Sequence, residues 1–168
     1  MTDFEQLYER YARDVYRFAL YLSGNPAQAE DIASETFVRV WTVRDSIRAV
    51  SVKAYLFTIA RNLHHDGRRR ESRHVELPEG LLDPGPGPEV EARDRQALGA
   101  VLRALQTIPE VDRAALLMRA QDGLPYDEIA RALGLTLAAV RVKVHRARLR
   151  IADLRAATNE LQSPRRES

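Results

Sequence analysis

A segment rich in proline and glycine limits what this chain can fold into. Residues 77–89 read Leu-Pro-Glu-Gly-Leu-Leu-Asp-Pro-Gly-Pro-Gly-Pro-Glu, with four prolines and three glycines. Proline fixes φ and lacks an amide donor, and glycine gives a helix no support, so we expect no regular element here. The chain therefore divides into an N-terminal unit (1–71), a linker (72–95), a C-terminal unit (96–158) and a polar tail (159–168).

Apolar residues recur at intervals of three and four in both units, which is the spacing of one helix face. In the first unit this spacing predicts helices over 4–22, 29–43 and 52–70. In the second it predicts helices over 96–106 and 111–120, followed by a helix-turn-helix. We therefore expect an all-α chain of two small helical domains joined by the Pro/Gly-rich linker.

Composition excludes several classes of protein. The chain has 168 residues and no cysteine, so it holds no disulfide framework and no cysteine-ligated zinc. It has no apolar run of about 18 residues and no secretory signal pattern at its start, so we expect a cytoplasmic protein without membrane contact. His64 and His65 face different ways on a helix, and no His-x-x-x-His spacing completes a metal site with His74. We expect no metal, no cofactor and no enzymatic activity.

The charge is distributed unevenly although the net charge is only +2. Basic residues concentrate in 61–73 and 141–155, and an acidic strip over 74–95 separates them. Arginine, whose planar fork suits phosphates and base edges, supplies 24 of the 26 basic residues. Two basic patches indicate two contacts with a polyanion.

Residues 124–148 have the pattern of a helix, a tight turn and a second helix. Gly134 suits the left-handed conformation that ends a helix, and Thr136 is a good N-cap for the next one. Val140 and Val144, four residues apart, then point back into the core. The pattern predicts a helix-turn-helix.

The outer side of the second helix carries small residues and cations, which fits a DNA major groove. The alternative is a plain helical hairpin with a solvated basic face. The short helix, the glycine, the threonine cap and the long basic helix together favour DNA binding. The candidate contacts are Arg141, Lys143, His145, Arg146 and Arg148.

Three segments in order resemble extracytoplasmic-function (ECF) sigma factors. Ile108-Pro-Glu, Gly123-Leu-Pro-Tyr-Asp-Glu-Ile-Ala and Val140-Arg-Val-Lys-Val-His-Arg-Ala-Arg resemble their C-terminal domain, which reads the minus-thirty-five promoter element. Residues 29–41 resemble the segment that binds the β′ clamp of RNA polymerase, and residues 54–62 resemble the segment that melts and reads the minus-ten element. The resemblance implies a subunit that binds core RNA polymerase at the β′ clamp and β flap and directs it to promoter DNA.

The resemblance also implies polymerase contacts on the second helix. Asp31 and Glu35 are four residues apart and share a helix face. With Ile32 and Phe37 they offer acids beside apolar anchors, which suits a basic partner; the alternative is helix-dipole and surface charge alone. Trp41 is either a partner anchor or a core residue, and we favour the core.

For the minus-ten element the resemblance implies contacts from the third helix. Tyr55 is an aromatic ring that can stack on an unpaired base, although burial in the core is an equal alternative for it and for Phe57. Asn62 offers a donor and an acceptor to a flipped base. Arg61 and Asn62 both match the end of this motif. The triplet that follows suits phosphates, or is a solvated helix end, and consists of Arg68, Arg69 and Arg70.

The recognition helix departs from the resemblance. Leu137, Ala138 and Ala139 stand where the family often has small hydroxyl residues, and Val142 replaces a commonly polar residue. These departures leave the preferred DNA sequence open.

Three functions fit the sequence. The first is a promoter-specificity subunit. Subunits of this kind are often inhibited by an anti-sigma factor, and we expect one here. The second is a stand-alone helix-turn-helix regulator, against which the melting segment argues. The third is a non-DNA decoy that binds polymerase or another regulator, against which the basic recognition helix argues.

Overall fold

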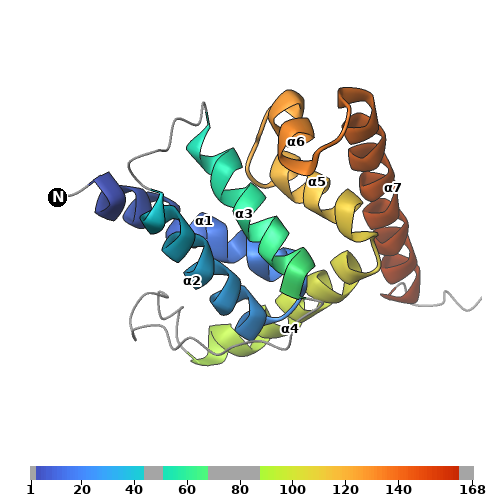
Figure 1. Ribbon diagram of the computed structural model, residues 1–168. Helices are drawn as coiled ribbons and strands as arrows, with labels where there is room; N and C mark the ends of the chain where they lie inside the picture. The colour runs from blue at the N-terminus through green and yellow to red at the C-terminus, as the bar shows by residue number, and fades with distance from the viewer. Residues whose placement is uncertain (1–2, 44–50, 68–87, 163–168) are drawn as a thin grey trace, which may run out of the picture.

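The computed structural model describes residues 3–43, 51–67 and 88–162, and within these ranges the chain is all-α (Figure 1). This confirms the predicted fold class. The N-terminal unit holds α1 (Asp3–Ser23), α2 (Pro26–Thr42) and α3 (Val52–Gly67). The C-terminal unit holds α4 (Pro88–Gln106), α5 (Glu110–Ala120), α6 (Tyr126–Leu133) and α7 (Leu137–Gln162).

In the N-terminal unit the three helices pack on one another around aromatic side chains. The rings of Phe18 in α1 and Phe57 in α3 are stacked with their centroids 4.6 Å apart, and both residues are fully buried. Asn25 caps α2, since its side chain accepts from the amides of Ala27 at 2.9 Å and Gln28 at 3.1 Å. The Asn25 cap fixes where α2 begins, and the shared core holds the three helices together.

In the C-terminal unit α5 packs against both α6 and α7, which also contact each other (Figure 1). Its Met118 is fully buried, as are Ile129 of α6 and Val140 of α7. Burial of each such side chain stabilises the fold by about 1.5–3 kcal/mol. The side chains of α7 that face α5 are therefore unavailable to a partner.

The predicted boundary between linker and C-terminal unit falls inside a helix. We expected the first helix of this unit to begin at Gln96, but α4 begins at Pro88, eight residues earlier. Proline suits the first position of a helix, and the following Glu-Val-Glu-Ala sequence contains good helix formers with acids near the N-terminus. The rest of the predicted linker, up to residue 87, lies outside the described residues.

The two units pack against each other where α1 meets α4 and α5 and where α3 meets α6. Arg113 of α5 is 2% exposed, and its guanidinium donates to the backbone carbonyls of Leu105 at 2.9 Å and Ile108 at 3.0 Å. It also donates to the carbonyl of Leu22 at the end of α1. Gln106 donates to the same Leu22 oxygen at 3.3 Å. One side chain thus satisfies three carbonyls where α1, α4 and α5 meet.

We predict that Arg113→Met destabilises the chain by about 3 kcal/mol, because three carbonyls lose a charged donor and remain buried. Urea unfolding followed by circular dichroism measures this. Arg155→Met, on the exposed surface of α7, is the control and should change stability by less than about 0.5 kcal/mol. Equal effects of the two substitutions would contradict the role given to Arg113.

Candidate nucleic-acid interface

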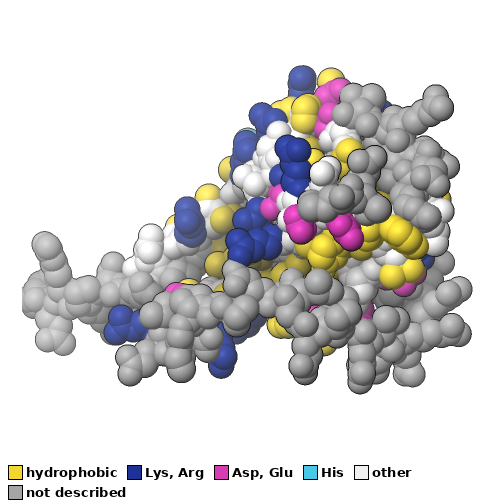
Figure 2. Space-filling model, turned by 90° about the vertical axis from the view of Figure 1, so that its left-hand side faces the viewer, with side chains coloured by type: hydrophobic (Ala, Val, Ile, Leu, Met, Phe, Trp, Pro, Cys, Tyr) yellow, Lys and Arg dark blue, Asp and Glu magenta, His cyan; other side chains and the backbone are white. Residues whose placement is uncertain are grey.

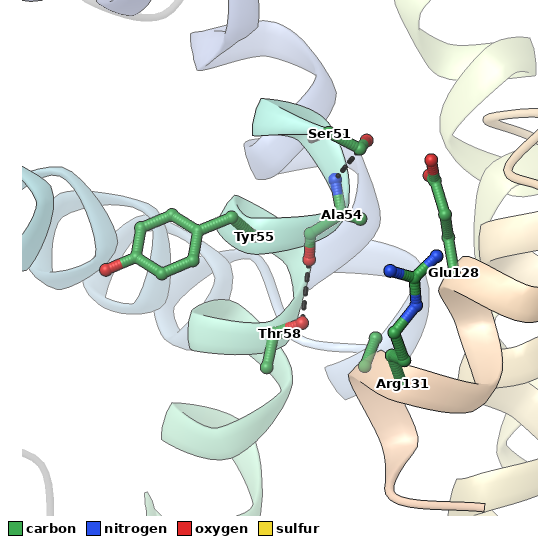
Figure 3. A pocket seen from close by; sticks show the side chains of 7 residues that line it. Ser51, Ala54, Tyr55, Thr58, Glu128 and Arg131 are labelled. Atoms are coloured by element: carbon green, nitrogen blue, oxygen red, sulfur yellow. Dashed lines mark hydrogen bonds between the residues drawn. The ribbon is translucent and has the colours of Figure 1, made fainter. Parts of the chain in front are cut away.

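Helix α3 carries the residues predicted to read unpaired DNA, and its side chains face three ways. Phe57 lies in the core, so it cannot stack on a base. Tyr55 is half-buried and points away from α6 (Figure 3). Asn62 is exposed. The accessible candidates on this helix are therefore Tyr55 and Asn62.

A pocket lies between the start of α3 and helix α6 (Figure 3). Its polar groups are largely used within their own helices. Ser51 Oγ accepts from the amide of Ala54 at 3.2 Å, and Thr58 Oγ1 donates to the carbonyl of Ala54 at 2.7 Å. Arg131 donates to Asp127 at 3.0 Å on the same helix. The pocket lies where the two units meet.

Arg61 does not face solvent but forms an ion pair with the C-terminal unit. Its Nε and Nη2 donate to the two carboxylate oxygens of Glu110 in α5, at 3.1 Å and 3.0 Å. The exposed fractions of the Arg61 and Glu110 side chains are 15% and 11%. His64 Nδ1 lies 3.7 Å from the same carboxylate, beyond hydrogen-bond distance. In this arrangement Arg61 is unavailable to DNA.

The two basic neighbours control the acidity of Glu110. Burial acts to raise the pKa of this carboxyl, but the imidazole of His64 and the guanidinium of Arg61 outweigh it. Together they lower the pKa of Glu110 from 4.5 to about 2. The ionised carboxylate is therefore the form that holds the units together.

A second acid of the C-terminal unit also faces cations of the N-terminal unit. The side chain of Asp122 has no exposed surface, and its Oδ1 lies 3.4 Å from Lys53 Nζ and 3.8 Å from Arg17 Nη2. Burial raises the pKa of Asp122, and the two cations offset part of this rise. Asp14 of α1 contacts both cations as well, at 3.4 Å each. Acids of the C-terminal unit thus occupy cations beside the predicted DNA-reading helix.

The helix-turn-helix forms as predicted. Gly134 ends α6 in the left-handed region with φ 66° and ψ 35°, where residues with a side chain are strained. The Thr136 hydroxyl accepts from the amide of Ala139 at 3.1 Å and so caps α7. Val140 and Val144 are buried. These contacts set the direction in which the other side of α7 points.

The predicted recognition cations of α7 are not equivalent. Lys143 is partly buried, and its Nζ donates to Asp112 of α5 at 3.3 Å. The Arg146 Nε lies 3.9 Å from the other oxygen of Asp112, while its side chain stays 60% exposed. The remaining predicted contacts are exposed, and they are Arg141, His145 and Arg148.

Arg141 is held by an aromatic ring that sequence reasoning did not single out. Its guanidinium carbon lies 5.9 Å from the centroid of the Tyr126 ring, and that of Arg119 lies 4.6 Å from the same ring. Such cation–π contacts contribute about 0.5–1 kcal/mol at exposed sites. Tyr126 begins α6, so only the turn geometry brings it under Arg141.

The predicted polymerase contacts on α2 differ in exposure. Ile32 and Phe37 are 8% and 5% exposed and belong to the core, where Phe37 packs edge-on against Tyr8 of α1. Asp31 and Glu35 are partly exposed, and Glu35 pairs with Arg39 at 3.5 Å. The polymerase contacts therefore stay a prediction, and burial leaves the two apolar residues little surface for a partner.

The exposed apolar residues of α2 are different ones, and our expectation of a core role for Trp41 was wrong. Val38 and Trp41 of α2 are 52% and 44% exposed, and Val43, the residue after α2, is 38% exposed. Trp41 packs edge-on against Phe4 with ring centroids 4.8 Å apart. Seen from the side of the α1 N-terminus, hydrophobic side chains gather beside acidic ones (Figure 2). Val38 lies three residues after Glu35, and this spacing places the two side chains next to each other on a helix. The sequence alone could therefore have indicated Val38 as a surface residue beside the acids.

Three of the predicted minus-ten contacts, Arg68, Arg69 and Arg70, lie outside the described residues. Within the described ranges, no group of three or more histidine and acidic side chains is arranged to hold a metal ion. No helix in the same part of the chain is long and apolar enough to cross a membrane.

Both units match known protein families. Residues 7–74 match the family described as Sigma-70 region 2, and residues 98–151 match Sigma-70, region 4. A three-helix region 2 joined to a region 4 with a helix-turn-helix defines the class of RNA polymerase sigma factors.

Relatives narrow the class. ECF RNA polymerase sigma factor SigL of Mycobacterium tuberculosis is 34% identical over 92% of this chain and 88% of that protein. ECF RNA polymerase sigma factor SigE of Mycolicibacterium smegmatis is 37% identical over 91% of this chain, which spans only 62% of that relative. The chain belongs to the ECF family of RNA polymerase sigma factors.

Solved structures show the same arrangement of helices. The sigma factor RpoE of Bartonella quintana, crystallised with the anti-sigma factor NepR, matches with a TM-score of 0.68 and 26% identity. The match covers 92% of this chain and 97% of that one. CnrH, solved with the cytosolic domain of CnrY, matches with a TM-score of 0.71 at 24% identity and supports the fold.

The low pKa of Glu110 predicts that its contribution to the stability of the fold depends on pH. A carboxyl whose pKa falls from 4.5 to about 2 on folding stabilises the structure above pH 4.5 by about 3 kcal/mol. That stabilisation is lost as the pH falls towards 2. Glu110→Gln should therefore be less stable than wild type at pH 7, with a difference that shrinks on acidification.

Urea unfolding at pH 7, 4 and 2.5 measures this difference. Asp127→Asn, an exposed acid in the first turn of α6, is the matched control and should cost little at any pH. A Glu110→Gln effect that does not change between pH 7 and 2.5 would contradict the assigned ion pair.

Proposed function

We propose that this chain binds core RNA polymerase and directs it to promoters with two separate elements, and that it has no catalytic activity of its own. The observation that carries this proposal is the joining of two different surfaces in one chain. One is α3 with the exposed Asn62, and the other is α7 with outward cations such as Arg141. The cytoplasm, where the polymerase acts, is the compartment that this function requires.

The division of labour follows the two units. Residues 1–71 melt and read the minus-ten element, with Tyr55 and Asn62 as base contacts and Arg61, Arg68, Arg69 and Arg70 on phosphates. Residues 96–158 read the minus-thirty-five element from the major groove through α7. Phosphate contacts set the register, and contacts to base edges select the sequence.

The exposed side of α2 is the surface we assign to the polymerase clamp. Asp31 and Glu35 supply negative charge for a basic partner, and Val38 lies beside them on the helix surface. Protein–protein interfaces place apolar side chains at their centre and polar or charged side chains at their rim. This assignment replaces the buried Ile32 and Phe37 with the exposed Val38 and Trp41.

The packing of the two units supports regulation by a partner. Arg61 is paired with Glu110, and Lys53 with Asp122. We call this packing of the two units the closed arrangement. In it, the two acids compete with DNA for these cations. RpoE of B. quintana was solved in complex with an anti-sigma factor. We infer that an anti-sigma factor binds this chain too and holds the units in the closed arrangement. Such a partner should compete with core polymerase for the chain.

The direct test of the function is in vitro transcription with core RNA polymerase and a pool of genomic promoter fragments. We expect discrete new transcripts that depend on the chain. Asn62→Ala and Arg141→Ala should each reduce them, because a lost base contact costs about 1–3 kcal/mol, or roughly 5- to 150-fold. Arg103→Ala, on the exposed surface of α4, is the control and should initiate normally.

If the free chain instead binds duplex DNA tightly and yields no transcripts with polymerase, the stand-alone regulator is the better description. If Arg141→Ala reduces the transcripts and Asn62→Ala does not, the role of Asn62 at the minus-ten element is rejected. The rest of the proposed function would still stand.

The assignment of the clamp surface has its own test. Val38→Asp should weaken binding to core polymerase by roughly tenfold or more, because a charge replaces an apolar interface contact. Since Val38 is exposed, the variant should fold normally. Leu161→Asp, at an exposed position near the end of α7, is the matched control and should bind normally. Fluorescence anisotropy of labelled chain against core polymerase measures both, and unchanged affinity of Val38→Asp would reject the surface.

A further inference from the structure

The outward side of α7 carries an apolar stripe between its cations. Ala138, Val142 and Leu149 are separated by four and seven residues, so they share one side of the helix. This side is opposite Val144, which is buried against α5. Val142 and Leu149 are each 52% exposed. The predicted DNA-reading side of α7 therefore presents apolar side chains as well as cations.

Charged groups lie along the two edges of this stripe. Arg141 stands on the edge nearer α6, where its guanidinium lies over the Tyr126 ring. Lys143 stands on the other edge, where Asp112 holds its ammonium at 3.3 Å. The same carboxylate lies 3.9 Å from Arg146 Nε. Contacts with the supporting helices thus keep these cations at the edges and leave Val142 between them.

A single exposed valine is ordinary on a protein surface. Here the valine lies in a row with other apolar residues, and cations that attract phosphates flank it. Those cations would bring the stripe against the floor of a major groove. The apolar group that a major groove presents there is the C5-methyl group of thymine.

We propose that Val142 contacts the C5-methyl group of a thymine in the minus-thirty-five element and makes α7 select thymine at that position. The proposal rests on the proposed function, since it assumes that α7 reads this element. A β-branched side chain in a helix has one dominant rotamer, so the contact is pre-positioned. Cytosine at the same place lacks the methyl and presents an amino donor that valine cannot satisfy.

The test removes one methyl group at a time from the DNA. Promoters recovered with the complete holoenzyme are resynthesised with each thymine of the minus-thirty-five element, on either strand, replaced singly by deoxyuridine. Uracil keeps the pairing and the O4 acceptor and loses only the methyl. We expect initiation to fall about fourfold at one position, which is the effect of exposing one buried methyl group.

A protein variant links this effect to one residue. With Val142→Ser, thymine and uracil at the sensitive position should give equal initiation rates, since serine offers no matching apolar contact. Val101→Ser alters a valine of α4 that is 47% exposed and is the matched control. It should keep the full difference between thymine and uracil.

The outcomes separate this proposal from the function on which it rests. Absence of any chain-dependent transcript would contradict the sigma-factor function itself. Transcripts without a uracil-sensitive position would overturn the thymine contact alone. A sensitive position that stays equally sensitive in Val142→Ser would overturn it too, because another residue would then contact the methyl.

Discussion

The first turn of α5 is the point on which the rest of the structure depends. Glu110, Asp112 and Arg113 are nearly consecutive, and their side chains go to three different elements. Glu110 pairs with Arg61 of α3, Asp112 pairs with Lys143 of α7, and Arg113 donates to a carbonyl of α1. Because each is largely buried, each needs its partner. One turn of helix therefore contacts both predicted DNA-reading helices and α1.

This arrangement has a consequence for how the protein works. Acids of the C-terminal unit neutralise cations of the N-terminal unit that lie beside the predicted minus-ten surface. The contacts that stabilise the closed form must be given up before Arg61 can reach a phosphate. Binding to polymerase can supply that free energy only if it favours the separated units over the closed ones. Ion pairs suit this task because promoter phosphates can replace the carboxylates that they lose.

Much of the fold could be predicted from periodicity and capping. The turn from Gly134 to Thr136 and the burial of Val140 and Val144 follow from local rules, and the structure has them. It was harder to predict which residues of α2 are buried and which are exposed, because α2 packs against two other helices. Ile32 and Phe37 looked like partner anchors because they stand beside acids, yet three-helix packing buries them. Their exposed counterparts, Val38 and Trp41, lie on the same helix.

Contacts between residues distant in sequence could not be predicted. Nothing near Arg61 indicates that a glutamate 49 residues later will hold it, and nothing near Lys143 indicates Asp112, 31 residues earlier. Both arginine and lysine looked like DNA contacts because a charge run carries no information about its partner. The start of α4 was misplaced for a different reason, since Pro88 was interpreted as part of a linker although proline also begins helices.

We propose that this chain reads promoters only as part of RNA polymerase. The most direct measurement titrates one fluorescent promoter fragment, recovered by transcription, with the free chain, with core polymerase and with the two together. We predict specific binding by the mixture and weak, sequence-independent binding by the free chain, because Glu110 holds Arg61 and Asp122 holds Lys53. Equally tight and specific binding by the free chain would contradict the account and favour a stand-alone regulator.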